Sequence, residues 1–309
     1  MSTLPTVVTS SVIRSSQQGE SHGGVYLVDL ERRSVRQVID WNDPSISWEG
    51  RGWDRGLRGI AFYAGNVYLA ASDEIFVYTP DFKRVKSYRN PYLKHCHEIC
   101  VQGDSLYLTS TGFDSVLEFD LRHEQFVQGY YLNRQNASQP QLHVFDPCST
   151  DGPALSMECH INNVSWMDGA LYVSGTKMNT LWRLEGSRLE AYATIPFTTH
   201  NARPYRDGVL CQDTGSDQVA YLDRDGTVKK TLSLVRYPQE SLSWTQLTAD
   251  RARQAFGRGL CVTDDQRIIA GSSPSTISVY EIGNVQPVAS VQITNDIRNA
   301  IHGLEIWPF

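Results

Sequence analysis

The chain has 309 residues, a formal net charge of -6, 40% hydrophobic residues and 20% charged residues. This composition is typical of a folded globular protein, and the absence of clustered Lys and Arg argues against a surface that binds nucleic acid. No window approaches 18 uninterrupted apolar residues and the N-terminus lacks the residue order of a signal peptide, so we expect no membrane partner and a cytoplasmic location.

The N-terminal region contains three segments with a strand pattern, TVVTSSVI, GGVYLVDL and SVRQVIDW. Six later segments share one signature, a polar residue capable of binding a ligand followed by a short apolar run. They are RGIAF from Arg58, HEICV from His97, HINNV from His160, HNARP from His200, RGLCV from Arg258 and HGLEI from His302. Each of the first five is followed by a turn rich in Gly, Asn or Asp and by further strand-like segments. The pattern indicates a repeated antiparallel unit.

The separation between signature residues suggests the size of the unit. Arg58 to His97, His160 to His200 and Arg258 to His302 are each about forty residues, the length of a four-stranded propeller blade. The two longer separations and the N-terminal stretch predict insertions at 40–57, 130–157 and 236–256, which we expect to lie over the face where the first strands begin.

The two ends of the chain complete the pattern, because HGLEIWPF is a first strand with no successors and the N-terminal segments have no first strand. The sequence therefore predicts an all-β, six-bladed propeller with four-stranded blades, in one domain spanning 1–309. The C-terminal strand is expected to pair with the N-terminal strands and close the fold. The alternative is a pair of β-sandwiches, which also contain short strands at regular spacing.

Four of the six signature residues are histidines. First strands line the central channel of a propeller, so the imidazoles of His97, His160, His200 and His302 are expected to converge on a metal ion. Imidazole favours a transition metal; we expect Fe, Cu, Zn or Mn, with Fe slightly preferred. The alternative is a hydrated channel in which these side chains bind only water and carbonyl groups.

Other polar residues near the signature positions are candidates for catalysis. Arg58 and Arg258 present guanidinium groups that could bind a small anionic molecule through a carboxylate or phosphate, or could form structural ion pairs. His302 is a fourth ligand or an acid/base group, and Glu98 could act in catalysis or orient an imidazole. The weaker candidates for substrate contact are Asn162, Asn163, Asn201 and Asp213.

These segments carry two resemblances. The architecture is similar to the gluconolactonase, paraoxonase and senescence-marker group, in which Glu, Asn and Asp at the heads of inner strands hold a divalent cation. Here the heads are HEI, HIN, HNA, HGL and two Arg-Gly pairs, so calcium-dependent lactonase activity is not implied. CHINNVSWMDGALYVSG, HNARPYRDGVLCQDTGSDQVAYLD and RGLCVTDDQRIIAGSS resemble a bacterial conserved family of unknown function, which supports the blade alignment and implies no chemistry.

The first hypothesis is a metal-dependent enzyme with an all-histidine centre that acts on a small anionic organic substrate. With iron it would be an oxidoreductase, an oxygenase resembling the carotenoid cleavage enzymes in its four-histidine site. With zinc or manganese it would be a hydrolase or lyase. The alternatives are a propeller that binds a ligand or peptide without turnover, and a structural scaffold.

Overall fold

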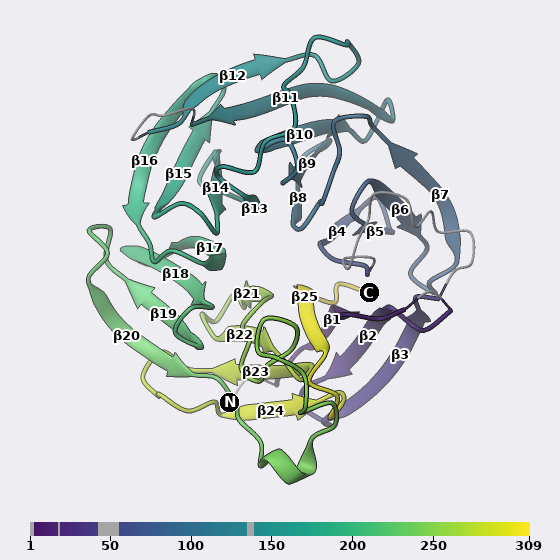
Figure 1. The fold of residues 1–309 in the computed structure, drawn as a ribbon, viewed down its shortest axis with the longest axis vertical. Coiled ribbons are helices and arrows are strands. Elements are labelled where there is room, and N and C mark those ends of the chain that lie inside the picture. Colours follow the sequence, from purple (N-terminus) through teal and green to yellow (C-terminus); the bar gives the residue numbers. More distant parts are fainter. Residues whose placement is uncertain (1–2, 18, 43–55, 135–138) are drawn as a thin grey trace. The chain divides into compact units, whose positions relative to one another are not determined.

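The computed structural model describes residues 3–17, 19–42, 56–134 and 139–309. The fold is an all-β, six-bladed β-propeller, as predicted, and its strands form six antiparallel sheets (Figure 1). Most of the predicted insertion at 40–57 lies outside the described residues.

The first three sheets along the chain follow the predicted order. The sheet that joins the two ends contains β25 (Asn299–Ile306), β1 (Thr6–Ile13), β2 (Gly23–Asp29) and β3 (Ser34–Asp40). The next contains β4 (Ile60–Tyr63), β5 (Asn66–Ala70), β6 (Glu74–Tyr78) and β7 (Arg84–Arg89). The third contains β8 (Ile99–Gln102), β9 (Ser105–Ser110), β10 (Ser115–Asp120), β11 (Gln125–Asn133) and β12 (Gln141–Phe145).

The other three sheets have four strands each. One contains β13 (Ile161–Met167), β14 (Ala170–Gly175), β15 (Thr180–Glu185) and β16 (Arg188–Thr194). Another contains β17 (Thr199–Tyr205), β18 (Gly208–Asp213), β19 (Gln218–Leu222) and β20 (Val228–Ser233). The last contains β21 (Leu260–Val262), β22 (Ile268–Ser272), β23 (Thr276–Tyr280) and β24 (Ala289–Gln292).

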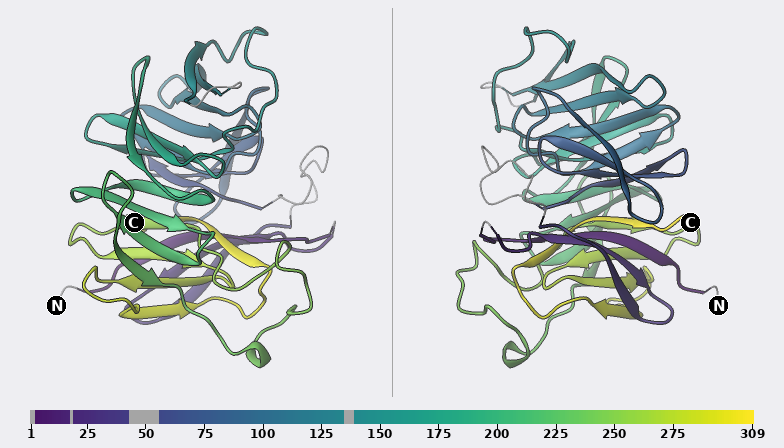
Figure 2. Two further views of the ribbon diagram at one scale, coloured as in Figure 1. Left: turned by 60° about the vertical axis from the view of Figure 1, so that its left-hand side comes forward. Right: turned by 90° about the vertical axis from the view of Figure 1, so that its right-hand side faces the viewer.

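The C-terminal strand closes a blade with the N-terminal strands. β25 pairs antiparallel with β1, so that Val7 lies opposite Ile306 and Thr9 opposite Leu304. Figure 2 shows β25 in yellow beside β1 in purple. This pairing confirms the closure predicted from the sequence, and it covers an edge of β1 that would otherwise expose unpaired backbone groups.

All six signature segments form the first strand of a sheet. His160 directly precedes its strand, the signature residues Arg58, His97 and Arg258 lie two residues before theirs, and the other two lie inside β17 or β25. The insertion at 130–157 is more ordered than predicted, because β12 extends the sheet as a fifth strand, with Asn133 opposite Gln141. Within 236–256 a 3-10 helix covers Gln239–Ser241.

The chain divides into two compact units, one of residues 1–58, 212–220 and 230–309 and the other of residues 59–211 and 221–229; the single domain stays a prediction. Each unit has its own hydrophobic core. Val7, Ile269 and Ile301 belong to the core of the first, and Leu108 and Ile161 to two separate core clusters of the second. Val7, Ile269 and Leu108 are buried because they lie on middle strands, which pack on both faces, whereas β3 is mostly exposed. No helix in the described ranges is long and apolar enough to cross a membrane.

Candidate functional site

The His97 imidazole has a fixed orientation in the 59–211 unit. Its Nδ1 lies 2.8 Å from the His95 carbonyl oxygen and 3.0 Å from the Thr111 hydroxyl oxygen. A carbonyl oxygen only accepts, so Nδ1 carries the proton and donates. Thr111 donates its own proton to the Ile161 carbonyl, which leaves its oxygen to accept from His97. Nε2 is therefore the ring nitrogen with the lone pair.

The backbone around His97 is fixed by the neighbouring strand and the neighbouring blade. The N–H groups of His97 and Glu98 both donate to the Thr109 hydroxyl at 3.0 Å. From the other side, the Gly59 N–H donates to the His97 carbonyl at 2.8 Å. A Cβ at Gly59 would lie 2.7 Å from the Ile99 nitrogen, so only glycine allows this approach. The first strand of one blade thus helps to position the next.

A buried carboxylate holds the segment that carries His160. Asp114 has no exposed surface. Its Oδ1 accepts from the His160 N–H at 2.7 Å, and its Oδ2 accepts from the Glu158 and Cys159 N–H groups at 2.6 and 3.1 Å and from the Ser156 hydroxyl at 2.8 Å. Burial raises the pKa of Asp114, although these donors oppose the rise.

This arrangement maintains an unusual backbone conformation. His160 has φ of 53°, a left-handed conformation that costs a non-glycine residue about 1 kcal/mol. Four hydrogen bonds from residues 156–160 to Asp114 stabilise this conformation, and Gly175 packs closely against it. A Cβ on Gly175 would lie 2.5 Å from the His160 carbonyl oxygen. Burial, together with the charge of Asp114, raises the pKa of Cys159 to about 12, so this thiol stays protonated at neutral pH.

The structure brings His97 and His160 together. Their ring centroids are 5.9 Å apart and the rings are inclined by 55°. Two imidazoles that share one ion, each bound at about 2.1 Å, hold their centroids roughly 4.5 to 5.5 Å apart. The pair is therefore close to the spacing of two ligands on one ion. Among the described residues, however, no group of three or more His, Cys, Asp or Glu side chains is placed to hold a metal.

Glu98 has an amide partner that the sequence did not indicate. Its Oε2 accepts a hydrogen bond from the Asn201 side-chain amide at 2.9 Å, and Asn201 follows His200 in β17. The contact joins the first strands of two blades of the same unit. Glu98 is thus oriented by an amide, and His200 is half-buried beside that amide on β17.

The weaker candidates Asn162 and Asn163 lie in the same unit as His97, whereas the other unit contains Arg58, Asp213, Arg258 and His302. His302 Nδ1 lies 3.1 Å from the Ala300 carbonyl, and its Nε2 accepts a hydrogen bond from the Arg258 guanidinium. Arg258 also lies over the Phe256 ring, 4.7 Å from its centroid. Arg58 is fully buried, and its carbonyl accepts from the Ser10 hydroxyl at 2.7 Å. Because His302 and the other three histidines belong to different units, the four-histidine centre stays a prediction.

Sequence reasoning missed Thr111, which contacts the His97 imidazole, and Asp114 and Thr109, which hold the backbone of the two histidine segments. A signal for the threonines exists, because the second strand of this blade reads SLYLTST and antiparallel pairing places its end beside the signature segment. Asp114 is not at the start of a repeat unit, and nothing in the sequence indicates its role. It acts on the following blade, 46 residues away in the chain.

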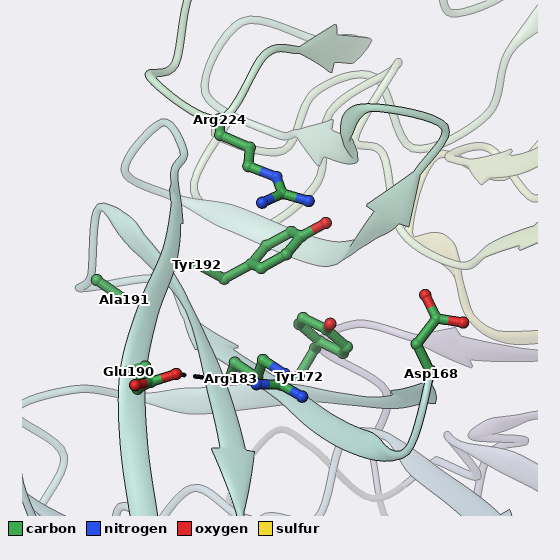
Figure 3. A pocket seen from close by; sticks show the side chains of 7 residues that line it. All are labelled: Asp168, Tyr172, Arg183, Glu190, Ala191, Tyr192 and Arg224. Carbon is green, nitrogen blue, oxygen red and sulfur yellow. Dashed lines mark ion pairs between the residues drawn. The ribbon is translucent and has the colours of Figure 1, made fainter.

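A pocket in the unit that contains His97 is lined by other residues. It has a volume of about 360 Å³ and is lined by Asp168, Tyr172, Arg183, Glu190, Ala191, Tyr192 and Arg224. Figure 3 shows the Arg224 guanidinium over the Tyr192 ring, 4.6 Å from its centroid, and Tyr172 meets Tyr192 edge to face at 4.8 Å. None of the predicted site residues lines this pocket.

Comparison with known proteins supports the fold. No family model matches the chain, and no curated protein matches it. A protein of unknown function from Bacteroides caccae is similar in structure with a TM-score of 0.58 and 9% identity, covering 97% of this chain and 98% of the other. The computationally designed Ika8 protein (TM-score 0.52, 9% identity, 97% and 91% covered) and the WD40 β-propeller domain of Doa1 (TM-score 0.52, 9% identity, 94% and 80% covered) are similar too. At these identities the likeness concerns the fold alone.

Proposed function

We propose that this chain is a metal-dependent enzyme that acts on a small anionic organic substrate beside the first strands of its blades. The observation that carries the proposal is the His97 and His160 pair, with ring centroids 5.9 Å apart and the His97 tautomer set so that Nε2 bears the lone pair. An imidazole that binds a metal through Nε2 usually donates its Nδ1–H to a carbonyl or carboxylate oxygen.

His97 and His160 would be the first two ligands, with His200 of the same unit as the third and His302 as the fourth. Imidazole ligands suit Fe, Cu or Zn, with Mn as a further candidate, and we prefer Fe. A bound metal would supply Lewis acidity to a hydrolase or lyase, or redox chemistry to an oxygenase. The architectural likeness to the gluconolactonase group is part of this proposal, without that group's calcium chemistry.

The chain's own side chains would position the substrate. Arg258 presents a half-buried guanidinium whose face rests on Phe256, which suits binding of a carboxylate or phosphate. Arg58 is fully buried, and a buried guanidinium is the second candidate for an anionic group. Glu98 is held by Asn201 and would accept or return a proton.

A second candidate is a propeller that binds a small ligand or peptide without turnover. It is favoured by the pairing of His302 with Arg258, since a guanidinium that donates to Nε2 occupies the nitrogen a metal would need. In that function Arg258 and His302 would form one recognition unit for an anion, and the chain would need no metal.

Cobalt substitution tests the proposal directly. Titration of apoprotein with Co²⁺ should give the visible absorption of an ion bound by nitrogen ligands, and His97→Ala or His160→Ala should weaken binding at least tenfold. His143→Ala is the matched control, because His143 is exposed on β12. If all three variants bind Co²⁺ equally, the pair is not a metal site. If no cobalt binds but a small carboxylate does, the second candidate is favoured.

A further inference from the structure

Asn162 differs from two nearby asparagines in the hydrogen bonding of its side-chain amide. Asn162 is 3% exposed, and neither its Nδ2 nor its Oδ1 has a hydrogen-bond partner among the described residues. Asn163 is equally buried, but its Nδ2 donates to the Ala202 carbonyl at 2.8 Å and to the Ser174 hydroxyl at 3.3 Å. Asn201 donates to Glu98. Of the three asparagines, only Asn162 keeps both amide atoms buried without a partner.

Such a group is costly for the folded protein. Burial removes the amide from water, and without replacement hydrogen bonds the folded state loses the solvation of a donor and an acceptor. A leucine of similar size would avoid this loss. An orphaned buried amide is therefore a feature that needs an explanation, and a ligand that supplies the missing donor and acceptor is one.

The position of Asn162 associates it with the proposed site. It follows His160 by two residues in β13, and the pairing of β13 with β14 shifts register between Ile161 and Asn163, so Asn162 is the extra residue of a β-bulge. Bulges are common next to active sites, where they redirect a side chain. β13 also lies beside β8 and β17, the strands at whose starts Glu98 and Asn201 meet.

We propose that the Asn162 amide is the recognition group of a buried subsite for a hydroxycarboxylate. A carboxylate oxygen would accept from Nδ2 while the adjacent hydroxyl donates to Oδ1, so that one ligand satisfies both orphaned atoms. This inference rests on the proposed function, for which it names the class of anionic substrate. A carboxylate without the hydroxyl would leave Oδ1 unsatisfied and bind more weakly.

The first test needs no ligand. Asn162→Leu should leave the urea midpoint of the ligand-free protein unchanged or raise it, because it removes two unsatisfied polar atoms. Asn163→Leu is the matched control and should lower the midpoint, because it breaks two hydrogen bonds. If Asn162→Leu lowers the midpoint as much as Asn163→Leu does, the amide has a structural partner such as a bound water and the inference is overturned.

The second test uses matched pairs of probes, glycolate with acetate, lactate with propionate, and citrate with tricarballylate, in calorimetric titrations of the metal-loaded protein. At least one hydroxy acid should bind the wild-type protein tenfold or more tightly than its partner, and Asn162→Leu should abolish that difference. If both acids of every pair bind with equal affinity, or if none of them binds, the proposal of a hydroxycarboxylate subsite is overturned. Cobalt binding measured on the same samples distinguishes this failure from failure of the metal proposal, since Asn162→Leu should keep the metal.

Discussion

Asp114 Oδ1 accepts a hydrogen bond from the backbone N–H of His160 at 2.7 Å, so a carboxylate of one blade sets the position of a predicted metal ligand of the next. The same carboxylate accepts three further hydrogen bonds from residues 156–159. The conformation of His160 therefore depends on a residue outside its own strand.

We expect Asp114→Asn to destabilise the protein by about 2–4 kcal/mol, because the new NH₂ group would face N–H donors that now meet a carboxylate oxygen. Urea denaturation followed by circular dichroism measures the change. Asp225→Asn is the control, since Asp225 is exposed, and it should stay within about 0.5 kcal/mol of wild type. Equal stability of the two variants would show that Asp114 does not hold this segment.

Thr111→Val should act on the orientation of His97. The variant keeps the shape of the side chain but removes the hydroxyl that accepts from Nδ1 and donates to Ile161. We expect affinity for Co²⁺ to fall by about 10- to 100-fold with a stability loss of about 1–2 kcal/mol. Thr150→Val, at an exposed position, should change neither quantity. If Thr111→Val binds Co²⁺ as tightly as the wild-type protein, the Thr111 hydroxyl does not position His97 for metal binding.

Gly175→Ala tests the close packing behind His160. The added methyl group would lie 2.3 Å from the Cys159 carbonyl oxygen and 2.5 Å from that of His160, so the backbone must shift. The expected destabilisation is about 1–3 kcal/mol. Gly283→Ala serves as the comparison, because a methyl group there meets no atom within 4 Å. A Gly175→Ala protein as stable as Gly283→Ala would contradict the described approach of β14 to this segment.

Buried tyrosines predict a loss of stability in alkali. Burial raises the pKa of Tyr280 to about 12, and its hydroxyl donates to the Ser233 carbonyl at 2.9 Å. The folded protein holds this proton more tightly than the unfolded chain, whose pKa is about 10. The stabilisation is therefore fully present below pH 10 and is lost as the pH rises toward 12. In Tyr280→Phe the urea midpoint should fall less steeply between pH 10 and pH 12 than it does in the wild-type protein. If the two proteins lose stability equally over this interval, the pKa of Tyr280 is not raised.

The fold was predictable because the repeat is periodic, with a turn at a fixed place after each signature segment and a C-terminal strand that only the N-terminal strands can pair with. Contacts between blades were not predictable, because nothing in the sequence around Asp114 indicates that its carboxylate accepts hydrogen bonds from residues 156–160. The contact of Glu98 with Asn201 was also unforeseen, because Asn201 lies 103 residues later and becomes a neighbour only when β8 and β17 both pack beside β13. β12 was read as part of an insertion, because a short strand without a partner pattern resembles a loop.

Elemental analysis of protein never exposed to a nickel column or a His tag would show whether the imidazoles of His97 and His160 bind a transition metal. We expect close to one equivalent of Fe, Cu, Zn or Mn per chain, and we expect this metal to be lost in His160→Ala protein that remains folded. A metal content near zero in the wild-type protein, or the same content in His160→Ala, would contradict this expectation.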